Sequence, residues 1–437
     1  MDRYRIRDFA AADDAACKAL ELSGGFMTPK NPIGKALFRA SFTHAAAFDC
    51  KARQYPSSHV IVCEDCTPQP GCPALVGVVM LGIKTVTLQG AEVLLGYTFD
   101  LRVHEQARRL GIGRRLCAEA EQRSRSAGVR VMYVARLHSL YFCNTLSMYL
   151  SVNADNARAI TLYESLGWSV ACARAPHMSL LTAALPTGLP SDVTVQQLSP
   201  DAAARSLAAA YCGRDCALTA DGFSQLLTTH PAYETSFSCS SAACASSASL
   251  HLWNGSLLGG FEVSRVIVPT LWLDSTFFLS AVAAAAAGLL SLASLWLQQQ
   301  ALARNHVPFI AGAAALALLL LAARCTAPSV LLARRLLVSS NYPECRKRVR
   351  ARVFGLSCSG PHGRALLAGL VQHAKNEARR RGFVLCAINL AADDPLQLAV
   401  GKPSFRTVFM QKSLGFDNCA PPPPFDPAGF HDPRDMS

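Results

Sequence analysis

The residues best suited to chemistry form a basic, glycine-containing segment in the first third of the chain. The segment Arg108-Arg-Leu-Gly-Ile-Gly-Arg114 follows the apolar run Val93–Val103 and overlaps the start of a helically spaced run, Ile112–Ala127. A strand that leads through such a turn into a helix leaves backbone N–H groups unpaired at the positive end of the helix. Glycine lets a phosphate approach the backbone closely because it has no Cβ atom. The segment therefore predicts a phosphate-binding turn.

The spacing of the glycines separates this segment from two common nucleotide-binding motifs. It is not the Gly-x-Gly-x-x-Gly of dinucleotide-binding folds, and no Gly-Lys-Ser/Thr follows it as in a P-loop. Taken alone, the segment leaves one alternative open, an ordinary strand, turn and helix with a basic first turn.

Two segments together resemble a known family. The basic segment is similar to motif A of the GNAT acetyltransferases, Arg/Gln-x-x-Gly-x-Gly/Ala, which holds the pyrophosphate of acetyl-CoA. Further along, Asn156-x-x-Ala-x-x-Leu-Tyr163-x-x-x-Gly167-Trp resembles motif B of the same family. Glycine at position 167 is placed to end a helix there. The two motifs occur in the family's order.

The resemblance implies a reaction and the residues that carry it. It implies acetyl-CoA as cosubstrate, no metal, and transfer of the acetyl group to a primary amine. Tyr163 would protonate the departing thiolate, and a backbone N–H near Leu101 to Val103 would polarise the thioester carbonyl. The residues expected to bind the cofactor are Leu101, Val103, Arg108, Arg109, Leu110, Gly111, Ile112, Gly113, Arg114 and Asn156.

No general base is assigned from the sequence. Alternation along a regular strand would place Tyr97, Phe99, Leu101 and Val103 on one face and Asp100 on the other. His104 and Glu105 fall in the following turn, so a water chain could remove the proton of the amine instead.

Apolar and polar segments follow one another in an order typical of a mixed α/β sheet covered by helices. Strands are expected at 3–9, 60–64, 74–85 and 94–103, with helices at 10–23 and 112–127. A further strand is expected at 129–135, followed by 136–150 as an insertion or an error in the gene model. We predict a first GNAT domain at 1–184 and a linker at 185–200.

The chain beyond the linker repeats this pattern. A strand is expected at 350–356, a turn at 360–363, a helix at 364–380 and a strand at 383–390. The turn lacks the Arg-x-x-Gly-x-Gly spacing. We therefore interpret 201–275 and 324–437 as a second, degenerate GNAT-like domain with weakened cofactor binding.

A narrower resemblance involves residues from both halves. Together with the basic segment, Trp253–Arg265, Ser359–Gly363, Ala392–Leu396 and Asp432–Asp435 are similar to the plant Hookless-type N-acetyltransferases. That resemblance implies a histone-acetylating regulator of hormone-controlled growth, in the nucleus or cytosol.

Two long uncharged runs interrupt the second domain. The runs 276–297 and 307–323 are each about long enough to span a bilayer, and an arginine-rich segment follows them. By the positive-inside rule they predict a transmembrane helical hairpin at 276–323, with both domains facing the cytosol. A helical hairpin packed on the protein core is the alternative.

Composition narrows the partners only in part. The net charge is +12, which suits CoA phosphates, an anionic membrane surface or nucleic acid. No nucleic-acid-binding motif is present, so no direct contact with nucleic acid is expected. The 17 cysteines have no secretory signal before them and are expected as free thiols. Cys63-x-x-Cys66 with Cys72 is an incomplete zinc pattern.

The sequence thus predicts an acetyl-CoA-dependent N-acetyltransferase with a protein or small-molecule acceptor. Because no base is assigned, a non-catalytic module that binds CoA or another protein is a second possibility. Turnover with any amine would distinguish the two.

Overall fold

The computed structural model describes residues 3–22, 39–44, 46–68, 72–88, 91–129, 131–133, 143–145, 147–153, 157–181, 184–212, 217–259, 261–267, 348–391, 394–400 and 407–413. The chain forms two compact units, 1–24 with 43–262 and 347–437, and 25–42 with 263–346. All elements discussed below belong to the first unit. In the second unit the described residues are parts of β2 (Arg39–His44) and β13 (Phe261–Ile267), which pair with each other.

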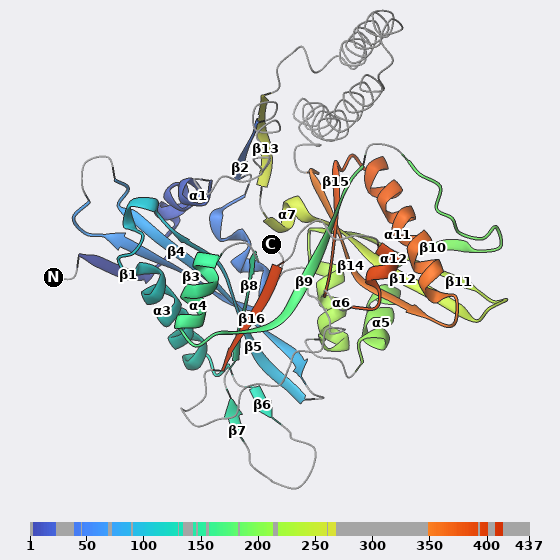
Figure 1. Cartoon of the computed structure of the whole chain (residues 1–437), viewed down its shortest axis with the longest axis horizontal. Helices are drawn as coiled ribbons and strands as arrows, with labels where there is room; N and C mark the ends of the chain where they lie inside the picture. The colour runs from blue at the N-terminus through green and yellow to red at the C-terminus, as the bar shows by residue number, and fades with distance from the viewer. Residues whose placement is uncertain are drawn as a thin grey trace, which may run out of the picture. The chain divides into compact units, whose positions relative to one another are not determined.

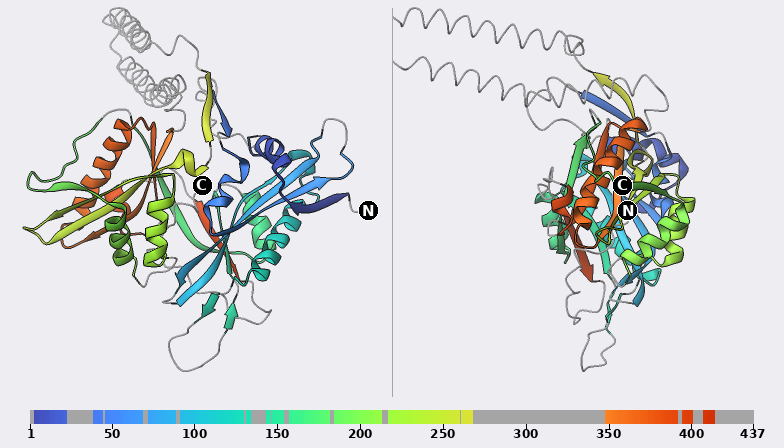
Figure 2. Two further views of the ribbon diagram at one scale, coloured as in Figure 1. Left: turned by 180° about the vertical axis from the view of Figure 1, so that it is seen from behind. Right: turned by 90° about the vertical axis from the view of Figure 1, so that its right-hand side faces the viewer.

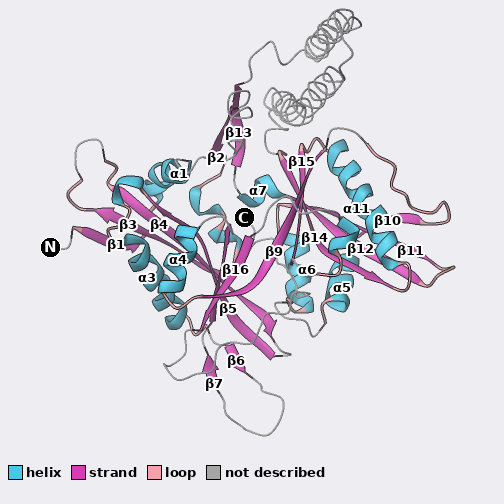
Figure 3. Ribbon diagram, in the orientation of Figure 1, coloured by secondary structure: helices cyan, strands magenta, loops and turns pink. Residues whose placement is uncertain are grey.

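A 12-stranded mixed sheet organises the first unit (Figure 1, Figure 3). In spatial order its strands are β1 (Tyr4–Asp8), β3 (Ser57–Asp65), β4 (Leu75–Leu88), β5 (Ala91–Val103), β8 (Ser147–Asn153), β16 (Thr407–Ser413), β9 (Ser169–Leu180), β15 (Leu385–Ala391), β14 (Arg350–Ser359), β12 (Ser246–Asn254), β11 (Tyr233–Ser241) and β10 (Thr194–Leu198). β6 (Val131–Tyr133) and β7 (Cys143–Thr145) form a separate pair.

Helices cover this sheet. They are α1 (Asp14–Leu22), α3 (Ile112–Ser126), α4 (Ala157–Ser165), α5 (Pro200–Ala210), α6 (Ala220–Thr229), α7 (Gly255–Gly259), α11 (Gly363–Arg380) and α12 (Gln397–Val400). Short 3-10 turns are η1 (Ala11–Asp13), η2 (Phe48–Cys50), η3 (Ala52–Gln54) and η4 (Glu105–Ala107). The expected mixed α/β fold is therefore confirmed, and the expected strands and helices of the first 127 residues lie within a few residues of their predicted bounds.

The order of elements in the second half repeats that of the first. The order β10, α5, α6, β11, β12, β14, α11 and β15 matches the order β1, α1, η2, β3, β4, β5, α3 and β8. This match leaves out α7 and β13 of the second half and η1, β2, η3, η4, β6 and β7 of the first. In each half the strand before the long helix pairs in parallel with the strand after it.

The strand predicted at 129–135 is not the strand that pairs with β5. The strand beside β5 is β8, which begins at Ser147, and not 129–135. Within that predicted strand the structure describes β6, which pairs with β7 in a separate two-stranded sheet. The segment 129–135 and β8 both have strand-like sequences. Which of them pairs with β5 is therefore decided by the tertiary structure and not by local sequence. The predicted insertion at 136–150 thus overlaps the start of β8.

Three apolar clusters hold the sheet and helices together. One lies under α3 and α4 and contains Ile112, Leu116 and Val79. A second joins aromatic residues of β5 to residues of α5 and α6, and a third packs α11 on β11, β12 and β14. The first two clusters lie on opposite faces of β4 and β5, as the alternation of Met80 and Val79 between them shows.

The predicted membrane anchor is corrected. Among the residues that the structure describes, no helix is both long and apolar enough to cross a membrane. The hairpin 276–323 lies outside the described residues, and the membrane placement with cytosol-facing domains is not retained. Length and lack of charge do not distinguish a spanning helix from an alanine-rich packed one, so this prediction rested on criteria that both share.

Candidate functional site

The candidate site opens where β5 and β8 separate. Their parallel pairing is limited to Gly96–Met148 and Tyr97–Tyr149. Beyond Tyr97, β5 continues to Val103 and stays paired with β4 on its other side. The backbone of β5 from Thr98 onward therefore has one edge without a strand partner among the described residues. Such an edge can hydrogen-bond an inserted ligand that carries amide groups.

A bulge at Asp100 reorients the end of β5. Phe99 faces Met80 on β4, whereas Arg102 faces Val78, so β5 has one more residue than β4 across this interval. Asp100 itself has φ +51°, which is unusual for a residue with a side chain. An extra residue in one strand shifts the alternation of its side chains.

The bulge makes the predicted face assignment wrong. Tyr97 and Phe99 pack in the cluster with α5 and α6, whereas Leu101 and Val103 pack against the α3 cluster on the other face. The prediction assumed a regular strand of period two. The four side chains consequently lie on two faces of the sheet, and Asp100 contacts Lys51.

The turn after β5 presents a row of open backbone donors. His104, Ala107 and Arg108 donate their N–H groups within the turn or to β4. Among the described residues, no backbone N–H from Arg109 to Arg114 has a hydrogen-bond partner. These groups lie at the start of α3, a helix of 15 residues, where its dipole is positive. The arrangement suits an anionic group with several oxygens.

Backbone conformation explains Gly111, and close packing explains Gly113. Gly111 is the residue before α3 and has φ +76°, a conformation that favours glycine. A Cβ at Gly113 would lie 3.3 Å from Leu162 Cδ2 and 3.8 Å from Val103. Gly113 therefore lets the first turn of α3 approach α4 and β5 closely. Arg109 has φ +67°, so the turn also holds a non-glycine residue in the left-handed region.

Charged and apolar side chains around the turn are accessible to a ligand. Arg108, Arg109 and Arg114 are exposed, and Arg108 Nε donates to the carbonyl oxygen of Val103 at 3.3 Å. Leu110 is half exposed, at 51%. The structure thus brings the residues predicted from motif A together at one end of α3, beside the open edge of β5.

Tyr163 lies on α4, which packs beside α3 on the same face of the sheet (Figure 1, Figure 2). The Tyr163 ring makes an edge-on contact with Trp168, with the ring centroids 5.9 Å apart. Burial, with a smaller contribution from Cys117, raises the pKa of Tyr163 well above the ordinary range of a tyrosine. The phenol is therefore protonated at neutral pH. Asn156 lies outside the described residues.

Gly167 ends α4 as predicted. It has φ +82°, and Trp168 donates its backbone N–H to the carbonyl of Tyr163 at 3.0 Å. This reversal orients Trp168 toward the ring of Tyr163.

A buried ionic cluster that was not predicted from the sequence lies behind the bulge. Lys51 Nζ lies 2.6 Å from Asp100 Oδ2 and 2.8 Å from Glu21 Oε1, and Arg102 lies 3.6 Å from the other oxygen of Asp100. Burial disfavours the ammonium group, but the two carboxylates outweigh it and raise the pKa of Lys51. The residues come from α1, the η2–η3 turn and β5, so no local spacing could have joined them.

Comparison with known proteins agrees with the geometry in the first half. Residues 56–170 match the family model described as the acetyltransferase (GNAT) domain. This part of the chain is similar to the GNAT acetyltransferase domain. The matched range includes both the basic turn and the segment Asn156–Trp168. No curated protein matches the chain.

Solved structures similar to the chain have low sequence identity. A GCN5-related N-acetyltransferase from Sphaerobacter thermophilus is 12% identical over 98% of this chain and 99% of its own, with a TM-score of 0.49. N-myristoyltransferase from Saccharomyces cerevisiae with bound myristoyl-CoA is 10% identical over 94% of this chain and 83% of its own, with a TM-score of 0.48. Arabidopsis thaliana NAA60 with a bisubstrate analogue is 18% identical over 40% of this chain and 90% of its own, with a TM-score of 0.28.

Proposed function

We propose that the chain is an acetyl-CoA-dependent N-acetyltransferase that acts on a primary amine. The observation that carries the proposal is the row of open N–H groups from Arg109 to Arg114 beside the unpaired edge of β5. The pyrophosphate of acetyl-CoA would accept from these groups, with Arg108, Arg109 and Arg114 adding positive charge. The amide-containing arm would lie along β5 between Thr98 and Val103.

Acetyl transfer then needs alignment, a polarised carbonyl and a proton for the leaving group. The amine nitrogen attacks the thioester carbonyl, and a backbone N–H near Leu101 to Val103 stabilises the developing oxyanion. The C–S bond breaks, the new amide bond forms, and Tyr163 donates its proton to the departing thiolate. The amine proton passes to water. The phenol of Tyr163 is protonated at neutral pH, as a proton donor must be, although burial makes it a weaker acid than an exposed tyrosine.

The buried cluster supplies geometry in this proposal rather than a base. Asp100 is held between Lys51 and Arg102. We propose that Lys51 and Glu21 fix the bulge and thereby hold the adjacent backbone N–H groups in place.

The second half is proposed to be a degenerate GNAT-like copy. Its order of elements supports this, as does a second bulge in the same place: Phe354 faces His251, whereas Ser357 faces Ser249. The extra residue there is Gly355, with φ +60°. The narrower Hookless-type resemblance, with a histone acceptor, stays a prediction.

The test is mass spectrometry of products after the full chain is incubated with acetyl-CoA and a library of primary amines. We expect acetylated product with the wild-type chain and none with Gly111→Asp. Acetyl-CoA binding without any product would instead favour a non-catalytic CoA-binding module.

A further inference from the structure

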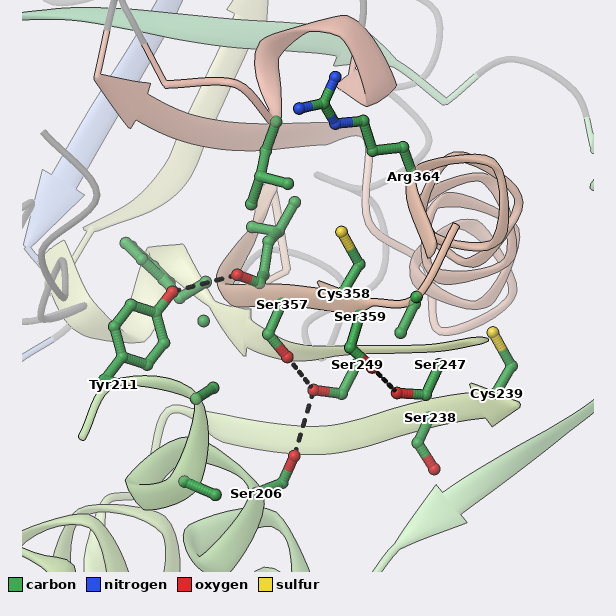
Figure 4. Close-up of a pocket in the computed structure, with 18 of the residues that line it drawn as sticks. Ser206, Tyr211, Ser238, Cys239, Ser247, Ser249, Ser357, Cys358, Ser359 and Arg364 are labelled. Carbon is green, nitrogen blue, oxygen red and sulfur yellow. Dashed lines mark hydrogen bonds between the residues drawn. The ribbon is translucent and has the colours of Figure 1, made fainter. Parts of the chain in front are cut away.

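The second half of the sheet encloses a cavity of about 740 Å³ that the proposed reaction does not use. Its lining residues come from β10, β11, β12, β14, β15, the end of α5, the first turn of α11 and residues 394–396 (Figure 4). A cavity of this size holds a ligand comparable to a drug-sized molecule or a short peptide.

One wall of the cavity is an open strand edge. β14 and β15 pair in parallel from Arg350–Leu385 to Val353–Ile388. Beyond Val353, β14 continues to Ser359, and within the described part of the chain it pairs there with β12 alone. Tyr211 lines the cavity, and its O–H donates to the main-chain oxygen of Leu356 at 3.2 Å (Figure 4). The main-chain oxygen of Leu356 therefore faces the cavity, where Tyr211 uses one of its two acceptor positions. A ligand with repeated amide groups matches such an edge, in the way that a peptide adds a strand to a sheet.

A second wall is lined by serine hydroxyls. Ser249 contacts Ser357 at 2.7 Å and Ser206 of α5 at 3.2 Å, and Ser247 contacts Ser359 at 2.8 Å (Figure 4). Ser238 lies directly across from Ser249 on β11. Each hydroxyl can both donate and accept, so this wall accommodates either polarity along an amide chain.

Arg364 and Asp394 both line the cavity, near Cys358. Arg364 lies in the first turn of α11, a helix of 18 residues, is exposed, and forms no ion pair with any residue that the structure describes. The acidic residue Asp394 also lines the cavity, and its Oδ1 accepts the N–H of Leu396 at 2.8 Å within its own turn. The helix start and Arg364 together favour one anionic group.

The turn before α11 does not match a pyrophosphate. Pro361 has no N–H, His362 donates its N–H to Ser246 Oγ at 3.1 Å, and Gly363 donates to the carbonyl of Gly360 at 3.1 Å. Three positions of this turn therefore offer no open donor, and among the described residues only the N–H groups of Arg364 and Ala365 in the first turn of α11 lack a hydrogen-bond partner. A carboxylate needs fewer donors than a pyrophosphate.

We propose that this cavity binds an extended peptide with a free C-terminal carboxylate. The peptide lies along the edge of β14 between Leu356 and Ser359, and its carboxylate pairs with Arg364 at the start of α11. This site is separate from the turn at Arg109–Arg114, and its existence does not depend on the proposed transferase activity.

The experiment uses Cys358, a free thiol that lines the cavity, as a reporter. The full chain is alkylated with iodoacetamide in the presence of a pool of random hexapeptides, and the rate at each cysteine is followed by peptide mapping. A C-terminally amidated pool is the chemical control, and the exposed Cys66 of the first half is the internal reference. We expect the free-carboxylate pool to slow alkylation of Cys358 several-fold, while the amidated pool and the rate at Cys66 change little.

Variants separate this site from the cofactor turn. Arg364→Gln should weaken protection about tenfold or more, because a charge-assisted contact is lost. Ser357→Val should also weaken it, and Gly111→Asp should leave it unchanged. Equal protection by both pools, no protection at all, or protection unaffected by Arg364→Gln would overturn the proposal. Protection of Cys358 by acetyl-CoA in the Gly111→Asp chain would do so as well, because the cavity would then be a second cofactor site.

Discussion

The two strand openings of this protein share a geometry but differ in the turn that follows. In each, a strand with a bulge after a phenylalanine, Phe99 or Phe354, separates from its parallel neighbour and leads to a long helix. Among the described residues the backbone donors from Arg109 to Arg114 are open at α3, whereas at α11 Pro361 has no N–H and those of His362 and Gly363 are bonded internally, which leaves only Arg364 and Ala365 open. The comparison indicates that the strands create the opening and the turn determines which anion it accepts.

The two bulges are also stabilised differently. Asp100 is held by the buried ammonium of Lys51. Gly355 lies against the ring of His251, and a Cβ at Gly355 would be 2.6 Å from His251 Cδ2. One bulge therefore depends on a buried ion pair and the other on close packing against a neutral imidazole.

The largest expected effect tests the difference between the turns. Gly111→Asp should weaken acetyl-CoA binding at least about 100-fold, since a carboxylate would occupy the anion site and displace two or more charge-assisted hydrogen bonds. Gly111→Asn is the matched control, because asparagine has nearly the same size, is neutral and tolerates positive φ. Calorimetric titration measures both.

The same titration gives the number of sites. We expect one acetyl-CoA per chain, and Arg364→Gln should leave the affinity unchanged. Two sites per chain, or wild-type affinity in Gly111→Asp, would contradict the distinction between the two turns.

Tyr163→Phe should lower kcat about 10²–10⁴-fold, the usual range for a general acid, with acetyl-CoA affinity nearly unchanged. Because burial raises the pKa of Tyr163, the wild-type enzyme should keep this acid protonated through the pH range where an exposed tyrosine ionises. Steady-state kinetics across pH, with calorimetry on the same samples, measures both quantities. An unchanged kcat at every pH would leave Tyr163 as a packing residue only.

Lys51→Met should destabilise the protein by about 3–5 kcal/mol, because Asp100 and Glu21 would be buried without their shared cation. Asp100→Asn should have a smaller effect, since Lys51 keeps its contact with Glu21. Urea unfolding at neutral pH gives both changes. If Lys51→Met matched the wild-type midpoint, the ion pair would not stabilise the first bulge.

The smallest expected effect is a loss of folding stability at acidic pH. Burial lowers the pKa of His251 to about 3 from an ordinary 6.5, so the folded protein holds it neutral while the unfolded chain takes up a proton. Its contribution to stability is therefore complete above pH 6.5 and is lost progressively as pH falls toward 3. We expect about 2 kcal/mol to be lost by pH 5.

His251→Gln is the comparison for that loss. It should lower the urea midpoint at pH 7 but flatten its decline between pH 7 and pH 5. Parallel declines in the two proteins would show that the acid sensitivity arises from other groups.

The sequence by itself determined the local features of the first site. The positive φ of Gly111 and Gly167, the start of α3 and the end of α4 follow from short-range backbone preferences that a single segment contains. The range 56–170 that matches the family model includes both motifs, because each motif is a single short segment of the sequence.

Only the tertiary structure decided which segments meet. The bulge at Asp100 reverses the alternation assumed for β5, and it depends on Lys51, which lies 49 residues away. The choice of β8 over 129–135 as the neighbour of β5 is likewise a matter of strand pairing between distant segments. The serine-lined cavity combines strands and helices from Gln196 to Leu396, which no local spacing connects. Backbone conformation is set within a few residues, but packing and charge pairing depend on the whole chain, and for that reason the turns could be predicted and their surroundings could not.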